Sequence, residues 1–415
     1  MNISLRAILI CLSLIGAGSW LPATGSALAA EDAASKDALN PAVGKLLQAA
    51  QELNKSKQYQ EALAKIDEAD RVKDKTPYEA YTIARIRGAT AFSAGQTDLA
   101  AQAFTTAMTY DRLTASEIQG IARVLAVQFY QKPDYPNAAL WATRYLEKGG
   151  SDPQLKVLLA QSYYLQKDMT KAAAVLQELN RADEAAGRVT EESQLKLWAS
   201  CEANLKRHAG MITTLEKLVT HYPKKAYWND LIRAAQRNPG FSERLALDAY
   251  RLQRYAGLLE ADEVLEMAQL AIQAGYPVEA KKLLDQGYAD QLLGSGADAA
   301  KQKKMQDQAN KEVAEDLKAL VQDEKRAEAA KTGVTPVGTG FNFVLHGQYD
   351  KGIALIEKGL AKGGLKYPED AKLKLAMAYL YAGQKDKAVQ AFKTITGTDG
   401  TEELARLWVI RINQG

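Results

Sequence analysis

The hexapeptide Gly383–Ala388, "GQKDKA", decides the fold because closely related turns return along the chain. Each begins with glycine or lysine, continues with polar residues and ends in a small residue. The small residues are Ala62, Ala100, Ala138, Ala172, Ala280, Gly352 and Ala388. They stand 38, 38, 34, 108, 72 and 36 residues apart, and the two long gaps are close to three and two periods. Such a period is typical of an array of helical hairpins.

A second small residue stands twelve positions before each of these. The second series is Ala50, Gly88, Ala126, Ala160, Ala268, Gly340 and Ala376. Larger apolar residues recur nine positions before and four after the first series, as Phe129 and Phe104 do. Small residues at these offsets allow two antiparallel helices to cross closely, with large side chains around the crossing. The pattern predicts an all-α superhelical array, or solenoid, of antiparallel hairpins whose helices are about 12–14 residues long.

These offsets resemble the W-x₂-L-G-x₂-Y…A-x₃-F…P pattern of the tetratricopeptide repeat family. The unit that begins with "LKLWASCEANLKRH" at Leu195 adds Trp198, Leu215 and a closing Pro223 to the match. Met211 replaces the small residue there, so we expect a loosened or shifted hairpin. The resemblance implies a TPR-like solenoid that binds partners in a concave groove lined by the first helix of each hairpin.

Changes in composition divide the chain into six segments. The segment that follows the first repeats should hold two helices broken at Asn238–Gly240. The predicted segments are a signal peptide at 1–29, a flexible stretch at 30–42, repeats at 43–224, a degenerate hairpin with one repeat at 225–293, a long charged helix with a linker at 294–335, and repeats with a capping helix at 336–415.

The long charged helix that interrupts the array has a thin apolar stripe. Its members recur every four residues: Met305, Ala309, Val313, Leu317 and Val321. The stripe contains little Leu and Ile, which favours packing along one edge of the array over a coiled-coil arm that reaches a partner. Both interpretations remain open at this point.

The N-terminus reads as a cleavable export signal. Arg6 precedes the apolar run "AILICLSLIGAG", and Ala27 and Ala29 form a small-x-small cleavage site. The run is shorter than the roughly 20 residues that span a bilayer, and no later run reaches that length. We therefore predict a secreted, periplasmic protein of a Gram-negative bacterium. Removal of the signal leaves Cys201 as the sole cysteine, so no internal disulfide can form.

The composition argues against several function classes. The 53 basic and 50 acidic residues give a net charge of +3, which argues against nucleic-acid binding. His208, His221 and His346 lie in separate repeats without metal-ligand spacing, and no catalytic motif is present. We expect Cys201 to be a buried, inert thiol rather than a nucleophile. The sequence predicts no enzyme, no cofactor and no metal.

Two rows of side chains are candidates for the partner-binding groove. The basic row is Arg85, Arg123 and Lys196, with Val157 breaking the series, and the aromatic row, seven positions further on, is Phe92, Tyr130 and Tyr164. Residues seven apart share a helix face. Such a surface suits an extended or helical peptide with acidic and apolar groups. The alternative is that the aromatic side chains pack against the neighbouring repeat.

The predicted function is that of a non-catalytic periplasmic scaffold or adaptor for a protein or peptide partner in the cell envelope. The mature chain is also similar to secreted proteobacterial TPR proteins associated with TonB-type energy transduction, which implies an accessory role in outer-membrane transport. That similarity rests on "FYQKPDYPNAALWATRYLEKGG" (129–150), "YPKKAYWNDLIRAAQRNPGFSERLALDAYRL" (222–252) and "KYPEDAKLKLAMAYLYAGQKDKAVQAFKTITGTDGTEELARLW" (366–408). The alternative is an envelope module that holds a glycan or exported polymer on the aromatic row. The oligomeric state is left open.

Overall fold

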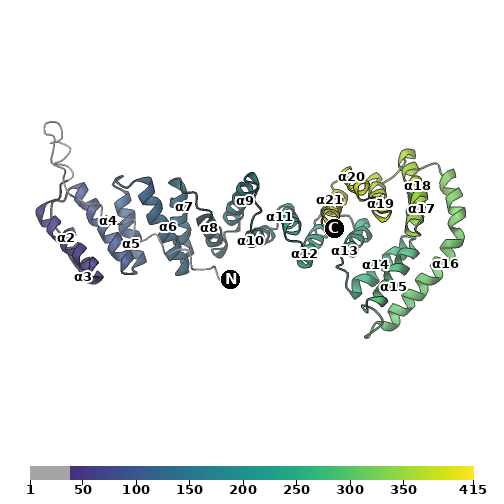
Figure 1. The fold of residues 1–415 in the computed structure, drawn as a ribbon, viewed down its shortest axis with the longest axis horizontal. Helices are drawn as coiled ribbons and strands as arrows, with labels where there is room; N and C mark the ends of the chain where they lie inside the picture. The colour runs from purple at the N-terminus through teal and green to yellow at the C-terminus, as the bar shows by residue number, and fades with distance from the viewer. Residues whose placement is uncertain (1–37) are drawn as a thin grey trace. The chain divides into compact units, whose positions relative to one another are not determined.

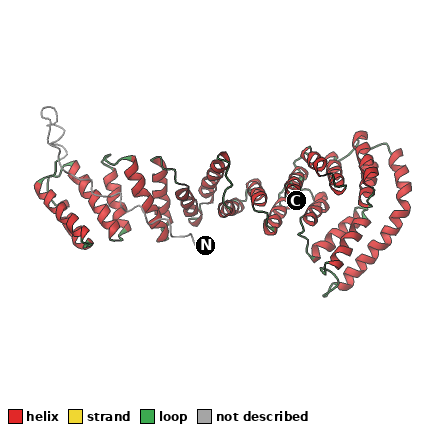
Figure 2. Cartoon of the chain, viewed as in Figure 1, coloured by secondary structure: helices red, strands yellow, loops and turns green. Residues whose placement is uncertain are grey.

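A computed structural model describes residues 38–415. The expected signal peptide, with Ala27 and Ala29, and most of the 30–42 stretch lie outside this range. The described residues form twenty α-helices and one 3-10 turn without any strand (Figure 2). The predicted all-α solenoid of helical hairpins is confirmed. Among residues 38–415 no helix is both long and apolar enough to cross a membrane.

The chain forms two compact units. The first runs to Lys132 and includes Thr143–Gly150, and the second holds Pro133–Ala142 and Ser151–Gly415. The helices of the first unit are α2 (Pro41–Lys55), α3 (Tyr59–Asp70), α4 (Pro77–Ser93), α5 (Thr97–Met108), α6 (Ala115–Gln131) and the end of α7 (Tyr135–Glu147). In Figure 1, α2 pairs with α3 and α4 pairs with α5 as antiparallel hairpins.

Capping boxes fix where two first-unit helices begin. Thr76 accepts a hydrogen bond from the Glu79 amide, and the Glu79 carboxylate accepts one from the Thr76 amide. Thr114 and Glu117 repeat the arrangement at the start of α6. Each box pairs amide groups that would otherwise lack a partner at the helix N-terminus.

The second unit continues the hairpins, with α8 on α9, α10 on α11, α14 on α15, α17 on α18 and α19 on α20. A break at Pro239 separates α12 from the next helical turn, η3. The helices are α8 (Pro153–Leu165), α9 (Met169–Ala185), α10 (Glu192–Asn204), α11 (His208–His221), α12 (Lys225–Gln236), η3 (Glu243–Leu245), α13 (Ala246–Tyr255), α14 (Ala261–Gln273), α15 (Pro277–Ala289), α16 (Ala299–Ala329), α17 (Val334–Leu345), α18 (Tyr349–Lys362), α19 (Pro368–Tyr381), α20 (Lys385–Lys393) and α21 (Thr401–Asn413).

The two series of small residues lie where the sequence places them. Every alanine of both series is 0% exposed, and the glycines are buried as well. At Gly88 an added Cβ would lie 2.8 Å from the Phe104 ring, so the α4–α5 crossing depends on the missing side chain. In the α10–α11 hairpin, Met211 is half-buried and Gly210 faces Glu202 instead, so the close approach is shifted by one residue.

The long helix α16 packs along α14, α15 and α17 and is not a free arm. Its buried residues are Gln302, Ala309, Leu320 and Ala327. The predicted stripe is wrong at Leu317 and Val321, which are 53% and 66% exposed. A step of four residues turns the helix by about 40° beyond a full circle, so the stripe leaves the packed face after Val313.

The final helix α21 closes the second unit onto itself. It packs on α19 and α20 and also on α11 and α13. The Gln414 amide donates to the Val219 carbonyl at 2.6 Å and accepts from Trp228 Nε1 at 3.2 Å. Trp408 is fully buried between the rings of Tyr255 and Phe392, with centroids at 5.2 and 5.6 Å. The helices from α11 to α21 thus form a closed body rather than an open row.

Candidate partner-binding groove

All six candidate residues lie on the first helix of a hairpin. Arg85 and Phe92 are on α4, Arg123 and Tyr130 on α6, Tyr164 on α8 and Lys196 on α10. The three basic side chains are exposed and the three aromatic side chains are half-buried. The first four residues belong to the first unit and the last two to the second. Their role in binding stays a prediction.

In the first unit, Arg85 makes an ion pair between neighbouring hairpins. Its Nη2 atom donates to Glu117 Oε1 at 2.9 Å, and the two side chains are 46% and 36% exposed. Exposed pairs of this kind contribute at most about 1 kcal/mol to stability. A carboxylate on a partner can therefore replace Glu117 at small cost. Arg123 and Tyr130, seven residues apart, share one face of α6.

In the second unit, Tyr164 is held by its neighbour. Its hydroxyl and the Ser200 hydroxyl lie 2.9 Å apart, which joins α8 to α10, and its ring packs on the core. At this position the structure agrees with the packing alternative. Lys196, one turn before Ser200, stays exposed.

The corresponding positions of the last three hairpins are not exposed. Three residues before the small residue of each first helix stand Leu265, Val337 and Leu373, which are 7%, 5% and 0% exposed. Four residues after it stand Ile272, Val344 and Leu380, which are half-buried or buried. The Arg251 guanidinium of α13 lies 4.8 Å from the Phe341 ring of α17. The exposed basic positions are therefore on α4 and α6 in the first unit and on α10 in the second, and on α8 the same position holds the half-buried Val157.

A buried ion cluster fixes α13 in place. Arg251 donates to both Glu279 oxygens at 2.9 and 2.6 Å and to Asp248 at 2.6 Å, and all three side chains are nearly inaccessible. Burial opposes the charge, but the two carboxylates outweigh it and hold the pKa of Arg251 well above its ordinary value. Burial raises the pKa of the adjacent Tyr276 to about 12. The cluster lines neither of the two pockets described below. Its role is structural, because the bonds from Arg251 to Glu279 hold α13 to α15.

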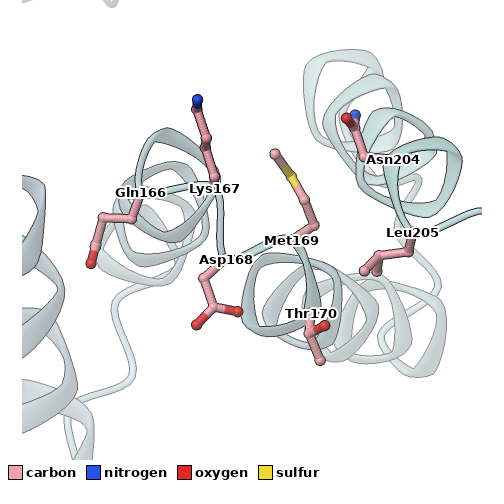
Figure 3. A pocket seen from close by; sticks show the side chains of 7 residues that line it. All are labelled: Gln166, Lys167, Asp168, Met169, Thr170, Asn204 and Leu205. Atoms are coloured by element: carbon pink, nitrogen blue, oxygen red, sulfur yellow. The ribbon is translucent and has the colours of Figure 1, made fainter.

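The larger pocket lies at the turns of the α8–α9 and α10–α11 hairpins (Figure 3). It measures about 770 Å³ and is lined by Gln166, Lys167, Asp168, Met169, Thr170, Asn204 and Leu205. In the figure, Met169 extends between Lys167 and Asn204, whereas Gln166 points away. A pocket of about 350 Å³ occupies the corresponding place beside the α17–α18 turn and the end of α19. These pockets are wedges between successive turns, and no predicted groove residue lines them.

Cys201 and His346, two reactive side chains of the sequence, are each engaged inside the fold. Cys201 is fully buried, and burial raises the pKa of its thiol to about 11, so the thiol stays protonated at neutral pH. Within residues 38–415 no three His, Cys, Asp or Glu side chains gather as metal ligands. His346 Nε2 instead lies 2.6 Å from Asp316, where it joins α17 to α16.

Sequence reasoning missed the closure of the second unit and its ion cluster. Asp248 and Arg251 are three residues apart on α13, a visible ion-pair spacing, but nothing in the pattern joined them to Glu279. The apolar residues at groove positions, such as Leu373 and Val337, were the available signal. Their hydrophobicity indicates that this face is covered.

Two family descriptions match parts of the sequence. Residues 131–218 match the family of anaphase-promoting complex, cyclosome, subunit 3, and residues 370–397 match a tetratricopeptide repeat family. Among curated proteins, none matches the sequence.

Several solved structures are similar over most of the chain. The Naa15/Naa10 structure with HypK-THB is 17% identical at a TM-score of 0.29 over 90% of this chain, which covers 60% of that chain. A tetratricopeptide repeat protein from Parabacteroides merdae is 13% identical at 0.23, over 70% of this chain and 98% of that one. Yeast Tom70 is 12% identical at 0.24, over 90% and 96%. At these TM-scores the likenesses carry no further argument.

The hairpins and their open first-helix face define a helical-repeat protein of the kind that serves as an interaction scaffold. The two matched families and the register of small residues support a tetratricopeptide repeat protein.

Proposed function

We propose that this protein is a non-catalytic scaffold of the periplasm that binds a protein or peptide on the exposed first-helix positions of its earlier hairpins. One contrast carries the proposal. Corresponding positions hold the exposed Arg85, Arg123 and Lys196 on α4, α6 and α10, the half-buried Val157 on α8, and buried apolar residues in the last three hairpins. Within residues 38–415, the exposed basic residues at this position therefore belong to the earlier hairpins.

The chemistry of the face favours an acidic partner. Arg85 donates a hydrogen bond to the Glu117 carboxylate, which supports an aspartate or glutamate of a peptide as its ligand. Phe92 and Tyr130 are half-buried and add apolar area beside the arginines. An extended or helical peptide with acidic and apolar side chains fits this surface.

The glycan alternative is weaker because the aromatic row is shorter than the sequence suggests. Tyr164 is engaged by Ser200 and packs on the core, so its ring is not free to stack on a sugar. The accessory role in TonB-linked outer-membrane transport rests on the sequence resemblance and belongs to the proposal as its narrower form.

Site-specific photo-cross-linking in intact cells tests this function. The photoreactive residue replaces Arg85 or Lys196, and control versions replace Gln102 on α5 or Glu178 on α9, both exposed on second helices. We expect a discrete protein adduct from the first pair and none from the controls. Polymer adducts alone would favour the glycan module, and equal adducts at all four positions would contradict a groove. The narrower role requires the adduct partner to be a component of TonB-linked transport.

A further inference from the structure

The outer face of α16 carries a row of lysines that the proposed groove does not use. Lys304, Lys311, Lys318 and Lys325 stand seven residues apart and are all exposed. A spacing of seven keeps them on one side of the helix, over about 30 Å of its length. None of the four forms an ion pair with a carboxylate in the described part of the chain.

A short apolar strip runs beside this row. It consists of Ala314, Leu317 and Val321, of which Leu317 is 53% and Val321 66% exposed. The spacing of three and four residues is that of the contact seam of a two-helix coiled coil. In that register, each lysine of the row directly follows the seam position that Leu317 occupies, which is the flanking position that pairs with charges on the other helix.

The face of α16 next to the strip is already anchored. Ala309 and Leu320 are buried, and Asp316 binds Asn342 and His346 of α17. Glu324, seven residues after Leu317 and so on the same side of the helix, pairs with Lys351 of α18, and the strip ends there. The exposed strip is thus presented by a helix that is held in place and has little freedom to turn it inward. Exposed apolar side chains on a fixed helix, with the four lysines along one side, offer an interaction surface.

We infer that the lysine row and the strip at Leu317 and Val321 form a second docking surface, and that its partner is an acidic amphipathic helix. Leucine-type side chains of that helix cover the strip, and glutamates at seven-residue spacing face the four lysines. Charge complementarity sets the choice of partner and its orientation. This surface is distinct from the first-helix groove and does not depend on the function proposed for it.

A fluorescent helical peptide serves as the probe. It carries leucines at its seam positions and glutamates at the flanking positions, and a control peptide replaces every glutamate by lysine. We expect the full-length protein to bind the acidic peptide in an anisotropy titration, more weakly as salt rises, and not to bind the control peptide. Equal binding of the two peptides would overturn the inference.

Variants of the protein locate the site. Lys311→Glu with Lys318→Glu, and separately Leu317→Ser with Val321→Ser, should each weaken binding at least tenfold. The exposed lysines Lys301 and Lys358 lie outside the row, so Lys301→Glu with Lys358→Glu should leave affinity within twofold. All four positions of the test variants are exposed, and unchanged circular dichroism and melting temperature verify the fold. Full binding by both test variants would refute the surface.

Binding of the lysine row to a lipid surface must be distinguished from binding of an acidic helix. Vesicles with and without phosphatidylglycerol are sedimented with the protein and with Lys311→Glu/Lys318→Glu. Loss of sedimentation in the variant, combined with no binding of the acidic peptide, would assign the row to anionic membranes and overturn the helix partner.

Discussion

Gly340 on α17 and Gly352 on α18 exclude side chains from each other's positions. A Cβ added at Gly340 would lie 2.6 Å from the Gly352 carbonyl oxygen, and one added at Gly352 would lie 2.5 Å from the Gly340 oxygen. The two backbones therefore touch at the point where the sequence pattern places the hairpin crossing. No residue larger than glycine fits there without moving the helices apart.

Gly340→Ala should destabilise the protein although alanine favours helix. The propensity gain is about 1 kcal/mol, and overpacking costs about 1–3 kcal/mol. Gly338 provides a matched control in the same helix, because an added Cβ there meets nothing within 4 Å. We expect Gly338→Ala to raise the urea midpoint and Gly340→Ala to lower it. Equal shifts would show that the crossing is looser than described.

Ala100→Leu and Ala138→Leu test the same register in earlier repeats. Both alanines are 0% exposed, so three added heavy atoms must displace a neighbouring helix, at about 1–3 kcal/mol each. Gln102→Leu, two residues from Ala100 and exposed, should change stability by less than about 0.5 kcal/mol. Unchanged thermal stability of either alanine variant would contradict the register.

Arg251→Met should strongly destabilise the second unit. It leaves Asp248 and Glu279 as buried charges without a counter-ion, which costs about 3–5 kcal/mol. Adding Asp248→Asn and Glu279→Gln to Arg251→Met removes both charges and should recover much of the loss. Chemical denaturation of the single and triple variants gives the comparison, and no recovery would mean that the cost is one of packing rather than charge.

The contacts of Asp399 with Arg244 and Thr401 should weaken in acid. The Thr401 hydroxyl and Arg244, which outweigh burial, lower the pKa of Asp399 to about 2, below the ordinary value of about 3.9. Since the folded state prefers the ionised form, its contribution is complete above about pH 4 and is lost as the pH falls toward 2. Asp399→Asn should be less stable at neutral pH and show a shallower loss over that range. Asp386→Asn, at an exposed carboxylate of α20, should follow the wild type, and identical pH profiles for all three proteins would refute the assignment.

Arg123→Glu combined with Tyr130→Ala should reduce partner capture and leave the melting temperature nearly unchanged. The charge reversal repels an acidic partner, and the truncation removes apolar area from the same face of α6. The yield of the adduct formed from position 85 measures capture, with Gln102→Glu as the control. A large fall in melting temperature would instead indicate that Tyr130 serves packing.

The sequence predicted those parts of the molecule that repeat. Ala62, Ala100 and their counterparts revealed the crossings because each hairpin solves the same packing problem with the same small residue. The apolar stripe predicted on α16 is wrong at Leu317, because residues spaced four apart turn gradually around a long helix and leave the packed face. The bond from Gln414 to Val219 joins residues 195 positions apart, and no period links them. Among the groove candidates, the exposed arginines could be predicted from register, whereas the engagement of Tyr164 by Ser200 depends on a neighbouring hairpin.

The closure by α21 also imposes an order on folding. The hairpins of the first unit use contacts close in sequence, so each can form soon after its own residues emerge. The closed body cannot form until Trp408 and Gln414 have left the ribosome, because their partners lie on α11 to α13. Until then the apolar residues of α13 and α19 remain uncovered.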